Sequence, residues 1–132
     1  MKWYYANIED QTLENNNFRK VLYTGNHMQL VLMSLKPLEE IGEEIHHDND
    51  QFFRWESWEG KCIIDDHEYD IWAEMVVIIP AWSKHNIINT STTQDLKMYT
   101  IYAPPHHKDG IIRSTKQEAE ENEEDFDGNT TE

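Results

Sequence analysis

Two short stretches of the chain hold the side chains best suited to chemistry. Glu44 and His46 are followed by Gln51, and His85 lies in the second stretch with Asn89 after it. Two imidazoles, one carboxylate and one amide oxygen make a plausible ligand set for one divalent ion. Imidazole suits Zn, Fe and Ni, and carboxylate oxygen adds Mn. The sequence therefore predicts one metal site, either Mn, Fe, Zn or Ni, on Glu44, His46, Gln51 and His85.

Each of these residues alone also has a simpler interpretation, as an interior histidine with satisfied hydrogen bonds or as a carboxylate at a rim. His47 should point away from His46, because successive side chains of a strand alternate between its two faces. His106 and His107 follow Pro104-Pro105 in an irregular segment, where an exposed pair is the expected arrangement.

The elements that must position the site are strands. Helical periodicity is nearly absent, and short runs with strand-like alternation dominate. In residues 29–33 the run is apolar on both faces, as in a strand covered by a second sheet. The spacing predicts an all-β jelly roll in one domain. The predicted strands are 18–24, 27–35, 51–57, 61–65, 68–72, 75–79, 84–89 and 96–103.

Alternation also predicts what surrounds the metal. Gln51, Phe53 and Trp55 share one face of their strand, so if Gln51 faces the interior, both rings form an apolar pocket wall beside it. A filled core is the competing interpretation of these two rings. Trp82 either roofs the pocket mouth or packs on the outer edge of the barrel.

The 132 residues carry a formal net charge of −15, and the charge is uneven. Residues 114–132 contain eight acidic residues and one lysine, a composition that predicts a disordered tail. The rest of the chain is also acidic, which argues against nucleic-acid or anionic-membrane partners, since phosphate binding needs clustered Lys and Arg.

The remaining features suggest a cytoplasmic protein. The N-terminal residues lack the apolar core of a secretion signal, and no apolar run approaches the roughly 20 residues needed to span a bilayer. Cys62 is alone and reads as a small buried apolar side chain. Trp3, Tyr4 and Tyr5 are too aromatic to be left in water, so we expect them to be buried across the barrel or at a homodimer interface.

The two stretches resemble the cupin motifs G-x5-H-x-H-x3–4-E-x6-G and G-x5-P-x-G-x2-H-x3-N. The first spacing runs from Leu38 to Trp58, and the second runs from Glu74 to Asn89, both without a gap. The chain is similar to small single-domain cupins labelled mannose-6-phosphate-isomerase-like, with the RmlC-like jelly roll. This resemblance implies a cupin β-barrel over residues 1–113. Residues 104–113 are expected to form an irregular exit before the acidic tail of 114–132.

Two departures from the motifs stand out. Glu44 replaces the first histidine of the family and Gln51 replaces its glutamate, which moves the carboxylate but keeps one negative charge among the four donors. Bulky residues also replace the motif glycines, which usually serve a positive φ. Either the turns have changed type, or the backbone is strained and the chain less stable than its relatives. The positions concerned are Leu38, Trp58, Asp66, Glu74 and Trp82.

The resemblance implies a metal-binding cupin that takes a small polar organic ligand, sugar-like or hydroxy-carbonyl, with isomerase or oxygenase activity as the enzymic form. Its predicted pocket lining is Phe53, Trp55, Trp82 and Asn89. The alternative is a non-enzymic cupin that binds a small molecule or acts as a dimeric scaffold. No catalytic residue is named by the sequence.

Overall fold

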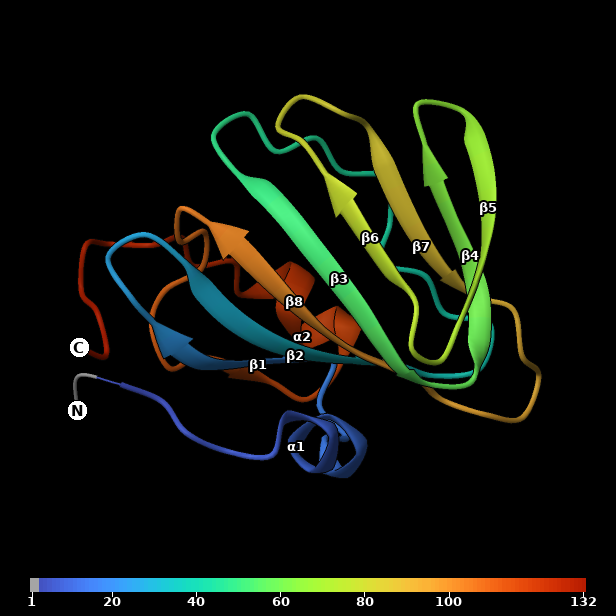
Figure 1. Cartoon of the computed structure of the whole chain (residues 1–132), viewed down its shortest axis with the longest axis horizontal. Helices are drawn as coiled ribbons and strands as arrows, with labels where there is room; N and C mark the ends of the chain where they lie inside the picture. The colour runs from blue at the N-terminus through green and yellow to red at the C-terminus, as the bar shows by residue number, and fades with distance from the viewer. Residues whose placement is uncertain (1–2) are drawn as a thin grey trace.

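The computed structural model describes residues 3–132; Met1 and Lys2, which the sequence placed in the barrel domain, lie outside the described residues. The eight predicted strands are confirmed to within a few residues at each end (Figure 1). In chain order the elements are α1 (Ile8–Glu14), β1 (Arg19–Thr24), β2 (Gln29–Leu35), β3 (Asp50–Ser57), β4 (Glu59–Ile64), β5 (His67–Trp72), β6 (Val76–Ile79), β7 (His85–Asn89), β8 (Leu96–Ala103), β9 (Ile112–Arg113) and α2 (Lys116–Glu121).

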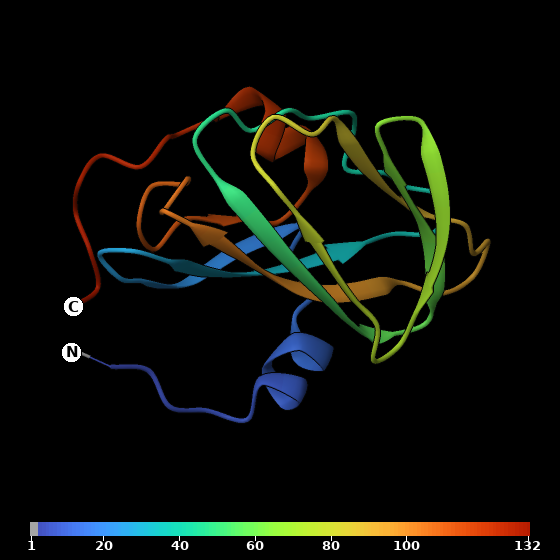
Figure 2. The same ribbon diagram turned by 45° about the horizontal axis from the view of Figure 1, so that its top comes forward.

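The strands form two sheets, in the jelly-roll arrangement that the sequence predicted. The larger sheet has the order β6-β3-β8-β2-β1-β9, and the smaller has the order β5-β4-β7. Every strand pair is antiparallel. Figure 2 shows the smaller sheet at one end of the molecule, with β3 and β6 crossing in front of the β8 and β2 strands.

The hydrophobic core fills the space between the sheets, and alternation along the strands decides which residues reach it. Along β8, Leu96, Met98, Thr100 and Tyr102 are buried while their neighbours are partly exposed. On β3 the buried set begins with Gln51. Because Gln51 lies opposite Tyr102 in the β3–β8 register, both side chains belong to the interior face.

Strand β2 is apolar on both faces for a reason that differs from the expected second sheet. Helix α1, which the sequence did not predict, packs against β2, β3 and β8. It begins at Asn7, whose side-chain oxygen accepts a hydrogen bond from the Asp10 backbone N–H at 3.0 Å. Neither helix of residues 3–132 has the length and hydropathy to span a bilayer.

The prediction of a disordered tail is wrong for residues 114–132. Ala119 of α2 is buried. The segment that follows α2 pairs with the irregular exit segment (residues 104–111) and with the end of β1. The segment is ordered in spite of its acidic composition, because a few of its backbone groups form hydrogen bonds with the rest of the chain. These hydrogen bonds are Lys108 N–H to Glu124 O at 3.1 Å, Phe126 N–H to His106 O at 3.0 Å and Thr131 N–H to Thr24 O at 2.8 Å.

The N-terminal aromatics are not buried by this chain. Trp3 is 72% exposed and Tyr5 is 96% exposed, whereas Tyr4 contacts Tyr23 with ring centroids 6.2 Å apart. Burial of these rings across the barrel is therefore excluded for Trp3 and Tyr5, and the homodimer stays a prediction.

The positive-φ positions inferred from the missing glycines are confirmed. The φ angles are 63° at Leu38, 65° at Trp58, 70° at Asp66, 76° at Glu74 and 75° at Trp82. Asp65, at 46°, makes the Asp65-Asp66 turn of the β4–β5 hairpin positive at both central residues, as a type I′ turn requires. Residues other than glycine adopt these backbone conformations only at a cost in conformational energy.

We expect Glu74→Gly to stabilise the protein, because Glu74 is exposed and only its backbone strain is removed. Relief of roughly 1–3 kcal/mol should exceed the entropic cost of about 0.4–1 kcal/mol for a new glycine. The free energy of unfolding in urea should rise by about 1 kcal/mol. The matched control is Glu68→Gly on the exposed face of β5, which should destabilise the fold; a loss of stability in both variants would contradict the strain argument.

Removal of residues 114–132 should lower the thermal midpoint by several degrees, because it exposes the surface under Ala119 and frees the bonded backbone of the irregular exit segment. A loss of about 2 kcal/mol corresponds to a fall of roughly 7 °C in a domain of this size. Circular dichroism melts would measure it. A shorter deletion of residues 129–132 should have a smaller effect, and an unchanged midpoint after the long deletion would show that the segment docks without stabilising.

Candidate metal centre

A backbone pairing brings the two chemical stretches together. The segment before β3 runs antiparallel to β7, so that Glu44 and His85 exchange both backbone hydrogen bonds at 2.9 Å. The Ile41 N–H bonds to the Ile87 carbonyl in the same ladder, also at 2.9 Å. Next to it, Asn86 accepts a hydrogen bond from the N–H of Gly42, which has a φ of 105°. This pairing places the Glu44 and His85 side chains on neighbouring strands.

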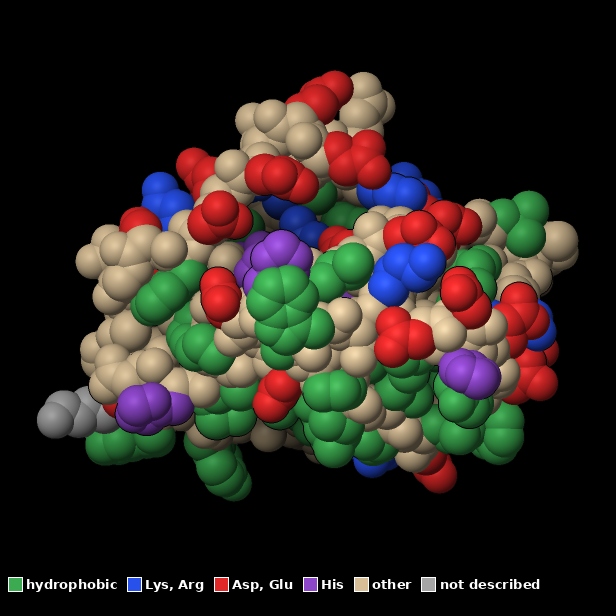
Figure 3. Space-filling view, turned by 90° about the horizontal axis from the view of Figure 1, so that it is seen from above, with side chains coloured by type: hydrophobic (Ala, Val, Ile, Leu, Met, Phe, Trp, Pro, Cys, Tyr) green, Lys and Arg blue, Asp and Glu red, His purple; other side chains and the backbone are tan. Residues whose placement is uncertain are grey.

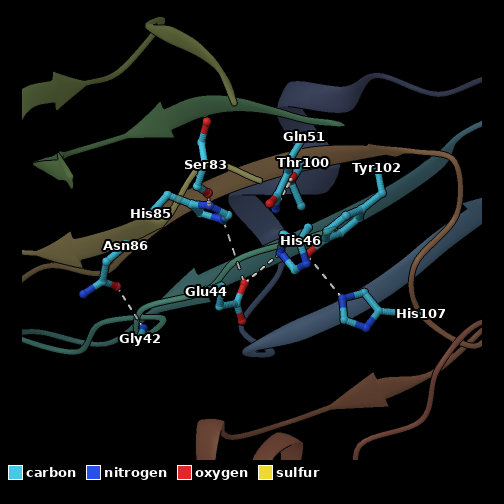
Figure 4. A network of polar contacts seen from close by, with 10 residues as sticks. All are labelled: Gly42, Glu44, His46, Gln51, Ser83, His85, Asn86, Thr100, Tyr102 and His107. Carbon is cyan, nitrogen blue, oxygen red and sulfur yellow. Dashed lines mark hydrogen bonds and ion pairs between the residues drawn. The ribbon is translucent and has the colours of Figure 1, made fainter. Parts of the chain in front are cut away.

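Glu44, His46 and His85 converge on one point (Figure 4). Glu44 Oε2 lies 3.0 Å from His46 Nε2 and 4.0 Å from His85 Nε2, and all three ligand atoms lie within 4.8 Å of one another. Atoms that each lie about 2.1 Å from one ion are separated by roughly 3.0–4.2 Å. A divalent ion therefore fits between these three atoms after a shift of less than about 1 Å in the His46–His85 spacing.

Two buried polar atoms next to the triad lack hydrogen-bond partners. One is Nε2 of His85, whose other ring nitrogen, Nδ1, lies 3.0 Å from the Ser83 carbonyl. Donation from Nδ1–H to that carbonyl leaves a lone pair on Nε2, as a metal ligand requires. The second is Oε1 of Gln51, because the Gln51 amide donates from Nε2 to Thr100 Oγ1 at 3.0 Å.

The local electrostatics favour an ionised Glu44 and a neutral His85. Burial raises the pKa of Glu44, but the hydrogen bond from His46 and the charges of His46, Arg19 and His85 outweigh it and lower that pKa below its ordinary value. Burial also lowers the pKa of His85, more than its bond to Ser83 and the charge of Glu44 raise it. An ionised carboxylate beside a neutral imidazole is the state that binds a cation.

His47 and Trp82 lie away from the site, in a contact of their own. The His47 ring is exposed and stacks on Trp82 with centroids 4.3 Å apart and an interplanar angle of 10°. Trp82 is 67% exposed, and its backbone N–H donates to the His46 carbonyl at 2.8 Å. The expected facing of His47 is confirmed. Trp82 does not line the pocket; its backbone positions His46 from behind.

Asn89 also has a structural role instead of the predicted pocket-lining one. Its fully buried side chain donates to the carbonyls of Leu35, Lys36 and Gln94 at 2.8–3.1 Å and accepts from the Ser91 N–H at 3.0 Å. Asn89 thereby ties the loop after β7 to the end of β2.

Phe53 and Trp55 are both fully buried and stack on each other, with centroids 5.7 Å apart. The Phe53 ring meets the His85 ring edge-on at 6.4 Å. Both aromatics are therefore core residues, and Phe53 supports the metal triad from the core side.

A cavity of about 260 Å³ opens beside the triad. Figure 3 looks onto this face, where blue Lys or Arg atoms lie in a hollow among red acidic side chains. Glu44 and His46 line the cavity, whereas His85 and Gln51 do not. The other lining residues are Arg19, Ile45, His106, His107, Ile111, Asn122, Glu123, Glu124 and Asp125.

His106 and His107 lie in the site and not in an exposed pair. The His106 ring meets the His46 ring at 4.5 Å, and His107 Nε2 lies 3.3 Å from the Tyr102 hydroxyl. Buried Gln29 holds this segment, because its Oε1 accepts from both backbone N–H groups and its Nε2 donates to the His107 carbonyl. The two prolines before His106 hid this pairing from sequence reasoning, and Gln29 in an otherwise apolar strand was the available signal.

Cys62 is confirmed as a buried apolar side chain. Burial raises the pKa of its thiol to about 11, so the thiolate that a nucleophile needs is scarce at neutral pH.

Comparison with known proteins agrees with this geometry. A family model described as a cupin domain matches residues 31–102. The chain is 42% identical to the uncharacterized protein YrkC of Bacillus subtilis over 89% of this chain and 66% of that protein, slightly under two thirds of its length. It is 45% identical to the uncharacterized protein L612 of Acanthamoeba polyphaga mimivirus over 83% of this chain and 70% of that protein.

The crystal structure of BH2720 from Bacillus halodurans is similar to this fold, with a TM-score of 0.88 and 38% identity over 90% of this chain and 94% of that one. The isomerase-like subtype expected from the motifs stays a prediction.

Asn89→Ala should destabilise the protein without changing its metal content, because Asn89 bonds loops and not the site. Loss of a buried amide with several partners costs about 2–3 kcal/mol, which urea unfolding would measure. Exposed Asn129→Ala is the matched control and should change stability by less than about 0.5 kcal/mol. Loss of metal at unchanged stability would instead return Asn89 to the site.

Proposed function

This chain belongs to the cupin family, and we propose that it binds one divalent metal ion on Glu44, His46 and His85, with Gln51 as a fourth ligand, and a small polar organic molecule beside it. Among the ions that suit imidazole and carboxylate together are Mn, Fe, Zn and Ni.

The observation that carries this proposal is the pair of unpartnered buried atoms. Nε2 of His85 and Oε1 of Gln51 have no hydrogen-bond partner although both are shielded from solvent. A buried polar atom without a partner costs about 1–3 kcal/mol, so two of them next to a charged carboxylate need a reason. A cation that accepts both lone pairs removes the cost.

The residues around the donors support this role. The Ser83 carbonyl orients the His85 ring, and Thr100 orients the Gln51 amide so that its oxygen stays available. His46 donates to Glu44 at 3.0 Å, and a metal ion would take the place of that shared proton. A bound divalent ion supplies Lewis-acid polarisation of a ligand oxygen.

The cavity supports the second half of the proposal. Its volume of about 260 Å³ lies below the range of about 300–1,000 Å³ typical of drug-sized ligands, so its occupant is a small molecule. Polar side chains dominate its lining, with Arg19, Glu44 and His106 among them, and these groups favour a ligand rich in oxygen.

Elemental analysis of the purified protein should give close to one equivalent of metal. His46→Ala and His85→Ala should each lower the metal content at least tenfold, because each removes one of two imidazole ligands. His47→Ala is the matched control, since its ring faces away and it should keep its metal. Metal-free wild type, or loss of metal only in the His47 variant, would overturn the proposal.

The metal affinity should also depend on pH, because protons compete with the ion for imidazole. The lowered pKa of His85 keeps that ring neutral to lower pH than an ordinary histidine. The affinity should therefore fall as the pH drops through the imidazole range, with protons competing for His85 only at the lower end of that range, which metal titrations at several pH values would show.

A further inference from the structure

The cavity beside the triad contains a cation that forms no ion pair with a carboxylate of the described residues. Arg19 is the one Lys or Arg among the described residues that line it. Its Nε is shielded from solvent and has no hydrogen-bond partner, and no carboxylate within residues 3–132 forms an ion pair with its guanidinium. The guanidinium lies over the Phe18 ring, with its Cζ atom 5.4 Å from the ring centroid.

An unpaired arginine is unexpected in this chain. There are 26 acidic residues for 11 basic ones, so a carboxylate partner is easy to find. The other two arginines have one: Arg54 lies 3.1 Å from Glu56, and Arg113 lies 3.0 Å from Glu124. Arg113 is opposite Arg19 in the β1–β9 register. Of two adjacent arginines, the one that faces the cavity is therefore the one without a partner.

The acidic side chains of the cavity wall are engaged elsewhere or exposed. Glu44 bonds to His46 at 3.0 Å, and Arg19 affects it only through its charge, which helps to lower the pKa of Glu44. Glu124 is held by Arg113 and lies 3.9 Å from Lys108. Glu123 and Asp125 are exposed at the rim. The charge of Arg19 consequently acts inward: after burial, it is the main cause that lowers the pKa of His107 well below its ordinary value.

We propose that Arg19 binds the carboxylate of a small hydroxy- or oxo-carboxylate whose hydroxyl or carbonyl oxygen lies on the metal side of the same cavity. This inference names the ligand class and rests on the proposed function. The planar guanidinium fork matches a carboxylate with two parallel hydrogen bonds. The ligand would supply the partner that Arg19 Nε lacks.

The chemistry of the cavity favours a carboxylate over a phosphate. A phosphate carries about two negative charges and is usually held by several cations or by backbone N–H groups. Here one arginine faces the interior, and acidic side chains lie at the rim. A ligand with a single negative charge is therefore the better match.

The test uses the full chain loaded with Mn²⁺ and titrated calorimetrically with L-lactate, with lactamide as the neutral counterpart of the same skeleton, and with inorganic phosphate. Lactate should bind at least tenfold more tightly than lactamide. Arg19→Gln should abolish that preference at unchanged metal content, and Arg19→Lys, which keeps the charge without the fork, should retain part of it. Arg54→Gln is the matched control and should bind as wild type does.

Equal affinity for lactate and lactamide, an unchanged preference in Arg19→Gln, or tighter binding of phosphate than of lactate would overturn the inference. The same titrations on metal-free protein separate it from the proposed function. If the protein takes up no metal but still prefers lactate over lactamide, and if this preference depends on Arg19, the metal site alone is overturned and the carboxylate site is supported.

Discussion

The reciprocal backbone hydrogen bonds between Glu44 and His85 are the constraint on which the site depends. They attach the segment before β3 to the first residue of β7, so two parts of the chain that are 41 residues apart share one register. The net gain from each such bond is only about 1 kcal/mol. Their importance is geometric, because a slip of one residue would turn Glu44 and His46 out of the interior.

The same constraint explains why strained turns persist around the site. The Trp82 turn has a φ of 75°, and it delivers the N–H that holds the His46 carbonyl. On the other side, the turn at Glu74 delivers an N–H to the Trp55 carbonyl at 2.7 Å. Both turns sit between strands whose positions are already determined by the two sheets, so the backbone angle is imposed on whichever side chain is present.

Much of this structure could be predicted from the sequence, because the relevant signals are local. Strand alternation placed Gln51, Phe53 and Trp55 on one face, and the motif spacing identified Glu44, His46 and His85 as a group. The missing glycines identified the positive-φ turns. Trp82 and Asn89 were wrongly predicted to line the pocket. The motif spacing does not show whether a residue contributes its side chain to the pocket or serves to hold the backbone around it.

What sequence reasoning missed depends on contacts between distant segments. Arg19 and His106 reach the cavity only because β1, β9 and the irregular exit segment come together. Residues 114–132 were judged by their average composition, which hid a local signal. Thr115 followed by Glu118 is a helix-capping pair, and in the structure Thr115 Oγ1 accepts from the Glu118 N–H at 3.1 Å. One buried alanine and a few backbone bonds then suffice to dock an acidic segment.

The cavity wall formed by residues 122–125 has a consequence for how the site can change during evolution. The metal donors all precede residue 86, whereas this wall is contributed by a segment that comes later in the chain and packs on the irregular exit segment. Substitutions in the wall can therefore alter the shape and charge of the ligand space while the donors keep their register. Part of the ligand space is thus encoded apart from the metal donors, so descendants of this protein can change this part of the cavity without losing the ion site.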